Sequence, residues 1–131
     1  MEWYLKVMKE NYSNFSGRAR RKEYWMFVLF VYIVLIIAVF LDGALGLCFD
    51  MGYGVVSPYG WITVLAYLLH FIPSLGVAVR RLHDVGKSGW FLLISFIPII
   101  GGIWLLILLC TDGDVADNAY GSNPKIEKEA A

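Results

Sequence analysis

The densest polar chemistry of the sequence lies in two short segments, which precede the first and follow the second of its long apolar runs. The candidate contact residues there are Arg18, Arg20, Arg21, Glu23, Arg80, Arg81, His83 and Asp84. Guanidinium groups bind carboxylate and phosphate through paired N–H donors. We expect Glu23 to pair with Arg80 or Arg81. We expect Asp84 to pair with Arg20 or Arg21, and the surplus positive charge to face lipid phosphates.

A second set of polar residues lies inside the second apolar run. It consists of Thr63, Tyr67, His70 and Ser74. Their spacing of four, three and four places them on one face of a helix. Polar groups are costly against lipid, so this stripe is expected to face the third apolar run around Ser95, Pro98 and Gly102. Interhelical hydrogen bonding is the favoured role of His70, with a proton relay as the alternative.

The sequence gives little support for catalysis or metal binding. His83 and Asp84 are merely adjacent, and no Ser or Cys stands in a recognisable activating context. Cys48 and Cys110 lack a second ligand at metal-binding spacing. The tail residues Asp112, Asp114, Asp117 and Asn118 depart from the calcium-loop pattern and indicate a solvated acidic tail. We therefore predict no enzyme activity, no metal and no cofactor.

The composition shows which elements must position these residues. The chain has 131 residues, of which 59% are hydrophobic and 17% charged. About 45–50% apolar residues is usual for soluble domains. Because the charges lie almost entirely outside three long apolar runs, an all-α membrane protein explains the excess. The formal net charge of zero excludes a uniformly basic nucleic-acid binder.

The apolar runs predict a single membrane domain, residues 1–131, with three transmembrane helices preceded by a short amphipathic interfacial helix. The first uncharged run has eighteen residues, and about 27 Å of helix is close to the thickness of the hydrocarbon core. The expected segments are an interfacial basic-aromatic segment (1–23), span one (24–41), a loop (42–60), span two (61–79), a charged loop (80–89), span three (90–110) and a polar tail (111–131).

The distribution of Lys and Arg predicts the orientation. Six precede the first run, none lies in the first loop, three lie in the second loop and two in the tail. This asymmetry favours a cytoplasmic N-terminus. Three full spans would place the tail outside. Pro98, Gly101 and Gly102 offer an alternative, in which the last run bends into a re-entrant hairpin and returns the tail.

Several motifs together resemble a known family. They are FSGRARRKEYW at 15–25, RRLHD at 80–84, Gly86 with SGW at 88–90, Pro98 with Gly101, and NAYG at 118–121 with Pro124. This combination resembles domain-of-unknown-function family 805, over nearly the whole chain. The resemblance implies a small bacterial inner-membrane protein without an established activity. It also implies that the polar segments, where the motifs gather, matter more than the apolar runs.

Three classes of function remain open from the sequence. The favoured one is interaction of a basic cytoplasmic rim with anionic membrane lipids or a protein partner, including a second copy of the chain. The second is a small transporter or channel component that uses the polar stripe with His70. The third is a membrane enzyme on lipid or phosphate groups, using Arg80, Arg81 and His83 with Asp84. A nucleic-acid partner is not expected.

Overall fold

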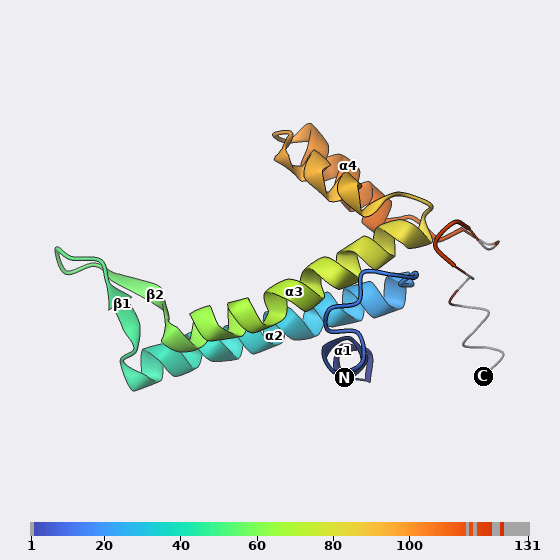
Figure 1. Ribbon diagram of the computed structural model, residues 1–131. Helices are drawn as coiled ribbons and strands as arrows, with labels where there is room; N and C mark the ends of the chain where they lie inside the picture. Colours follow the sequence, from blue (N-terminus) through green and yellow to red (C-terminus); the bar gives the residue numbers. More distant parts are fainter. Residues whose placement is uncertain (1, 115, 117, 122–123, 125–131) are drawn as a thin grey trace.

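Two long antiparallel helices form the axis of the molecule, and every other described element packs against them or extends from their ends (Figure 1). The computed structural model describes residues 2–114, 116, 118–121 and 124. Its elements are α1 (Glu2–Lys9), α2 (Arg21–Leu45), β1 (Cys48–Asp50), β2 (Val56–Gly60), α3 (Trp61–Asp84), the 3₁₀ helix η1 (Gly89–Phe96) and α4 (Ile100–Cys110).

Helices α2 and α3 have the length and the surface of membrane spans. They contain 25 and 24 residues, which is roughly 36–38 Å of helix against a hydrocarbon core of about 30 Å. In their most apolar stretches only 11% and 22% of residues are buried. A core helix of a soluble protein would be mostly buried, whereas these helices expose residues such as Phe40 and Leu65. The exposed apolar faces fit lipid.

The end of the axis where α2 passes into α3 is closed by a hairpin and a carboxylate. The expected loop at 42–60 contains an antiparallel two-stranded sheet, in which Cys48 pairs with Gly60 and Asp50 with Val56. The Asp42 carboxylate of α2 accepts hydrogen bonds from the backbone N–H groups of Gly60, Ile62 and Thr63, each at 2.9 Å. Asp42 thereby caps the N-terminus of α3 from a neighbouring helix.

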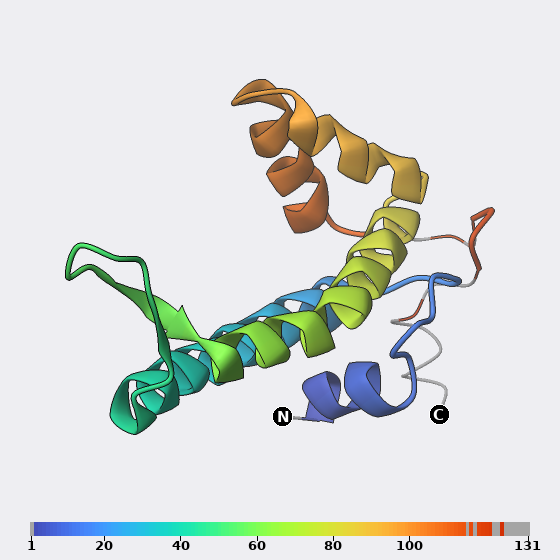
Figure 2. The ribbon, with the colours of Figure 1, turned by 60° about the vertical axis from the view of Figure 1, so that its left-hand side comes forward.

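The third apolar run is not a continuous helix. It divides at residues 98–100, where the Ile100 N–H donates to the Pro98 carbonyl at 2.7 Å and Ile99 has φ 66° and ψ −64°. This is the strained form of a γ-turn. Helix α4 then folds back beside η1 (Figure 2). Each half is about 16 Å long, which is too short to cross a bilayer, and the continuous span expected at 90–110 is absent.

A substitution at Gly101 tests this hairpin. A Cβ at Gly101 would overlap the Ile94 carbonyl of η1, whereas a Cβ at Gly102 would meet nothing within 4 Å. We expect Gly101→Ala to destabilise the protein by about 1–3 kcal/mol through overpacking. Gly102→Ala should be neutral or slightly stabilising, because Ala is the better helix former. Thermal unfolding in nanodiscs measures both; equal stabilities would contradict the hairpin.

Helix α1 lies across the helical pair and is seen end-on where α2 and α3 run across the view (Figure 1). The small core at this crossing contains Val7, Ala19, Phe27 and Val77. Trp3 and Val7 are the buried residues of α1, and Lys6 and Lys9 are exposed. The expected short helix therefore exists, although it occupies only residues 2–9 of the predicted segment; its place at the membrane interface stays a prediction.

The connection that follows α1 supplies a hydrogen-bond donor that α3 lacks at Pro73. Pro73 has no N–H, so the carbonyl of Leu69 cannot receive the usual helical hydrogen bond. The Tyr12 hydroxyl donates to that carbonyl at 2.6 Å. The same connection passes close to Gly76, where a Cβ would lie 3.0 Å from the Asn14 carbonyl oxygen. These contacts hold the N-terminal segment against α3.

Candidate functional site at the polar end of the helical pair

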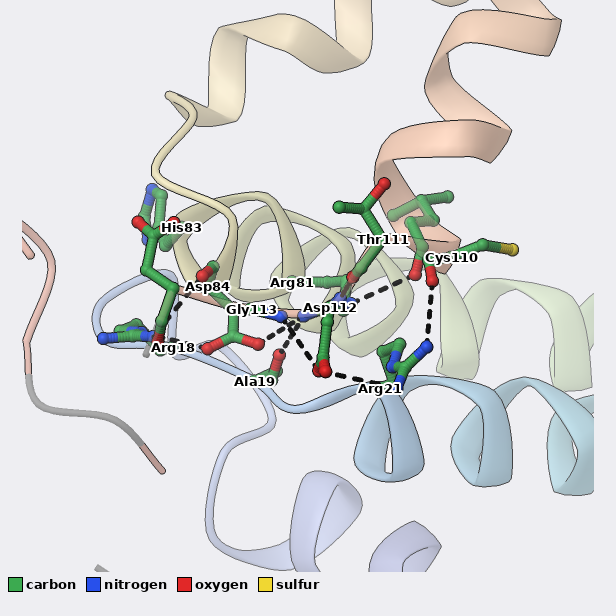
Figure 3. A network of polar contacts seen from close by, with 12 residues as sticks. Arg18, Ala19, Arg21, Arg81, His83, Asp84, Cys110, Thr111, Asp112 and Gly113 are labelled. Atoms are coloured by element: carbon green, nitrogen blue, oxygen red, sulfur yellow. Dashed lines mark hydrogen bonds and ion pairs between the residues drawn. The ribbon is translucent and has the colours of Figure 1, made fainter. Parts of the chain in front are cut away.

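The centre of the candidate site is the buried carboxylate of Asp84, at the last residue of α3. Its Oδ1 accepts from Arg18 Nε at 3.0 Å, and its Oδ2 accepts from Arg81 Nη1 (Figure 3). All three residues are buried, with exposed fractions of 2%, 8% and 0% for Asp84, Arg18 and Arg81. The prediction that Asp84 pairs with Arg20 or Arg21 was wrong, because those two side chains extend away from Asp84, one over Trp3 and the other toward α4.

Arg81 joins α3 to the segments around it. Its Nη1 also donates to the Ala19 carbonyl and its Nε to the Leu109 carbonyl, both at 3.1 Å. Its Nη2 donates to the Thr111 carbonyl. The planar guanidinium has five N–H donors in a fixed geometry. One side chain therefore fixes the start of α2, the end of α4 and the tail at the same place.

Arg18 holds the tail. Its Nη1 donates to the carbonyls of Ala116 at 3.0 Å and Gly121 at 3.2 Å, and its Nη2 donates to the Asp114 carbonyl. The Asp114 N–H donates to the Asp84 carbonyl at 2.7 Å. The described part of the tail is thus docked through its backbone, while the side chains of Asp112 and Asp114 are exposed, as the predicted solvated acidic tail requires. Asp117 lies outside the described residues.

His83 contributes a second contact to the tail. Its Nδ1 donates to the Gly17 carbonyl at 2.9 Å, and its ring stacks on Tyr120 with centroids 4.0 Å apart. The Asn118 amide donates to the His83 carbonyl at 2.9 Å. These contacts occupy the ring nitrogen nearest the backbone and one face of the ring, and they position His83 as a packing residue between two loops.

Arg80 and Glu23 form the one ion pair that was predicted and is present. Arg80 Nη1 lies 2.7 Å from Glu23 Oε1, and both side chains are 4% exposed. The side chains of Arg18, Glu23, Arg80, Arg81, His83 and Asp84 are called the polar hub below. Removing one partner from such a buried pair costs far more than removing an exposed pair, so the hub is primarily a structural device.

The remaining cations lie outside the hub. Lys6, Arg20 and Lys22 surround the Trp3 ring, at 5.6–5.9 Å from its centroid. Arg21 forms an exposed ion pair with Asp112 at 3.5 Å. Cation–π contacts of this kind contribute roughly 0.5–1 kcal/mol at exposed sites. Arg18 and Arg81 are engaged by Asp84 and by backbone carbonyls, whereas Arg21 and Lys22 at the start of α2 are exposed, as the predicted lipid-facing role requires.

The predicted stripe on α3 does not act as one surface. Thr63 donates its hydroxyl to Asp42 at 2.6 Å, at the opposite end of the axis. Tyr67 and Ser74 border a cavity shared with α2. The expectation that the stripe faces Ser95, Pro98 and Gly102 was wrong, because the third run turns back on itself at residues 98–100. The stripe instead contacts α1 and α2.

His70 is buried under α1, with 2% of its surface exposed. Its Nδ1 lies 2.7 Å from the Ala66 carbonyl, so it donates there, and the Tyr4 hydroxyl lies 2.7 Å from its Nε2. The Tyr4 ring stacks on both His70 and Phe27. We assign the neutral Nδ1–H tautomer from these partners. In this arrangement His70 anchors the interfacial helix.

Replacing Tyr4 with Phe tests this anchor. The substitution leaves the buried Nε2 of His70 without its donor, and we expect a loss of about 1–2 kcal/mol. Tyr59→Phe, on the exposed hairpin, is the control and should have no effect. Burial raises the pKa of the Tyr4 hydroxyl above its usual 10.0. The stabilisation is therefore fully present below pH 10.0 and is lost as the pH rises through the higher folded value. Unfolding scans between pH 7 and 11 measure it; no difference between Tyr4→Phe and the parent would contradict it.

The described residues contain no group of three or more His, Cys, Asp or Glu side chains that could hold a metal ion. Cys48 and Cys110 are free thiols in different parts of the molecule. Cys48 is in the hairpin strand β1, and Cys110 ends α4.

Known proteins resemble the chain over nearly its whole length. The model of a family described as "Protein of unknown function (DUF805)" matches residues 12–122. The chain belongs to the DUF805 family. The matched residues include every member of the polar hub. Two relatives from Escherichia coli strain K12 are inner membrane protein YhaI, 46% identical over 95% of this chain and 97% of the relative, and inner membrane protein YhaH, 42% identical over 97% and 99%. No solved structure matches.

The description of these relatives as inner membrane proteins agrees with the two candidate spans, so this DUF805 member is an integral inner-membrane protein. Sequence reasoning missed several residues of its polar end. Trp3, Asp114 and Tyr120 contact candidate residues from far along the chain. Tyr120 lies three positions after Asp117 and six after Asp114. Although the NAYG motif includes it, nothing in the local sequence predicts that it stacks on a histidine, so only the fold could reveal these contacts.

Proposed function

We propose that this DUF805 protein acts by interaction, with a cationic cleft that contacts anionic lipid headgroups on the cytoplasmic side. In this proposal α2 and α3 cross the membrane, and η1 and α4 enter and leave from the same side. The polar hub holds these elements together. The hub is thus the support of the contact surface, and the exposed cations beside it are the contact.

The observation that carries the proposal is a cleft at the start of α2. It has a volume of about 480 Å³ and is lined by Arg20, Arg21, Lys22, Trp25 and Cys110. No acidic residue of the described part of the chain lines it, and Asp112 pairs with Arg21 beside it at 3.5 Å. Arg21 and Lys22 are exposed, and the Trp25 ring is 37% exposed. Tryptophan favours the headgroup level of a bilayer, and each nearby basic residue contributes about 1 kcal/mol of attraction to an anionic leaflet.

The cytoplasmic placement is supported by charge. The segments 1–23 and 80–89, which meet at this end of α2 and α3, include nine Lys and Arg. The segment 42–60 at the other end includes none. Basic residues near span ends stay in the cytoplasm. Helix α4 ends at Cys110, whose carbonyl accepts a hydrogen bond from Arg21 Nη1 at 3.2 Å. The tail, which follows Cys110, therefore belongs to the same side in this proposal.

Lipid analysis tests the contact. The protein is purified in nanodiscs of native membrane, and co-purifying lipids are measured by mass spectrometry. We expect anionic lipids to be enriched over the bulk membrane, and Arg21→Gln with Lys22→Gln to reduce that enrichment by up to roughly 30-fold. Lys9→Gln with Lys87→Gln is the matched control, since it removes the same charge outside the cleft. Identical lipid profiles for the parent and both variants would contradict the proposal.

A further inference from the structure

A second cavity borders the polar hub and shares Arg20 with the cationic cleft. Its volume is about 510 Å³, and α1, the connection from α1 to α2, and α3 contribute to its walls. The charged residues that line it are Glu2, Lys6, Arg18, Arg20, Glu23 and Arg80. Four of these are basic and two acidic, and Glu23 is already paired with Arg80. The cavity therefore has a surplus of positive charge.

Arg80 is the unusual member of this lining. It is 3% exposed, and only its Nη1 is engaged, by Glu23. Its Nε and Nη2 are buried and have no hydrogen-bond partner among the described residues. These two nitrogens form the side-on fork of a guanidinium, which binds two oxygens of one carboxylate or phosphate. A buried fork without an acceptor is costly, so an acceptor beyond the described residues is indicated.

Two further cations lie around the same cavity. Arg20 Nε is also buried and without a partner among the described residues. The Lys6 side chain lines the cavity from α1, where Lys9 does not. Arg20, Lys6 and Arg80 come from three different segments, so their convergence depends on the fold and not on one run of basic residues.

We propose that this cavity binds one phosphate group, with the Arg80 fork on two of its oxygens and Lys6 and Arg20 supplying further charge. Phosphate is favoured over carboxylate because Lys6, Arg20 and Arg80 all line this cavity, and phosphate offers more charge and more acceptor oxygens. The phosphate belongs either to a soluble phosphate compound or to a lipid headgroup. The site goes beyond the proposed lipid contact, because Lys6 and Arg80 do not line the cationic cleft, and Arg20 is the one residue that borders both.

Titration of the full chain with inorganic phosphate tests the site. The protein is held in maltoside micelles, which contain no phosphate, and calorimetry is performed at constant ionic strength. We expect saturable binding of one phosphate per chain. Lys6→Gln should weaken the affinity at least tenfold, and Lys9→Gln, on the same helix but outside the lining, should stay within twofold. Arg80→Lys keeps the charge and removes the fork, and should also weaken binding at least tenfold.

Added phosphatidylglycerol distinguishes the two sources. Competition with inorganic phosphate identifies a headgroup as the natural occupant, and unchanged phosphate binding identifies a soluble compound; both support the site. Absence of saturable phosphate binding, or binding that Lys6→Gln leaves unchanged, would overturn it, even if Arg80→Lys fails to fold. Arg21→Gln with Lys22→Gln should leave this binding within twofold, so failure of the site and failure of the lipid contact are separable.

Discussion

Asp84→Asn is expected to lower the free energy of unfolding by about 3–5 kcal/mol, which is a large part of the 5–15 kcal/mol available to a typical domain. The amide keeps the shape of the side chain and can still accept a hydrogen bond. It cannot compensate the buried charges of Arg18 and Arg81, which both bind this carboxylate. Thermal unfolding in nanodiscs, followed by tryptophan fluorescence, measures the loss.

Asp112→Asn is the matched control for this prediction. Asp112 forms an ion pair with Arg21 in which the side chains are 59% and 45% exposed. Solvent screens such a pair, so the expected change is within about 0.5 kcal/mol. The hub would not be the structural centre of this end of the protein if Asp84→Asn and Asp112→Asn were equally stable.

Arg81→Lys is expected to be nearly as damaging, with a loss of about 3 kcal/mol, although it preserves the charge. An ammonium group is one point donor on a flexible stem, whereas Arg81 reaches carbonyls in three separate segments as well as Asp84. Each buried carbonyl left without a donor costs about 1–3 kcal/mol. The end of α4 and the start of the tail should loosen first.

Hydrogen exchange measures where Arg81→Lys acts. We expect faster exchange at residues 107–114, where the bonded carbonyls of Leu109 and Thr111 lie, and unchanged exchange at the opposite hairpin. Arg21→Lys is the control, because Arg21 is exposed and contacts α4 only through the Cys110 carbonyl. Protection at residues 107–114 equal to that of the parent would show that Arg81 does not fix α4.

The sequence was informative where one interaction decides the outcome. Long apolar runs without charge predict helices in lipid, and α2 and α3 follow them within a few residues. A pair of Glu23 with Arg80 or Arg81 was predicted because opposite charges at one end of two neighbouring helices must approach each other, and Arg80 is the partner. Both conclusions depend on the local sequence pattern and on the high free-energy cost of leaving a charged group unpaired in or near lipid.

The sequence was less informative where several elements compete for the same group. Asp84 was expected to pair with Arg20 or Arg21, and its pairing with Arg18 and Arg81 depends on the path of the connection after α1. Pro98 and two glycines allowed both a full span and a hairpin, and the structure has a γ-turn at Ile99 that divides the run. The partner of His70 came from Tyr4, 66 positions away. No periodic pattern contains such information.

Thiol labelling from the two sides of the membrane tests the central arrangement most directly. In a chain with Cys48→Ser and Cys110→Ser, single cysteines are introduced as Asp50→Cys in β1, Lys87→Cys in the loop after α3, or Asp112→Cys after α4. A membrane-impermeant maleimide should label Asp50→Cys from outside, and Lys87→Cys and Asp112→Cys from the cytoplasmic side. Labelling of Asp112→Cys from the same side as Asp50→Cys would mean three full spans. It would contradict a polar hub that holds the connection before α2, the loop after α3 and the tail on one side of the membrane.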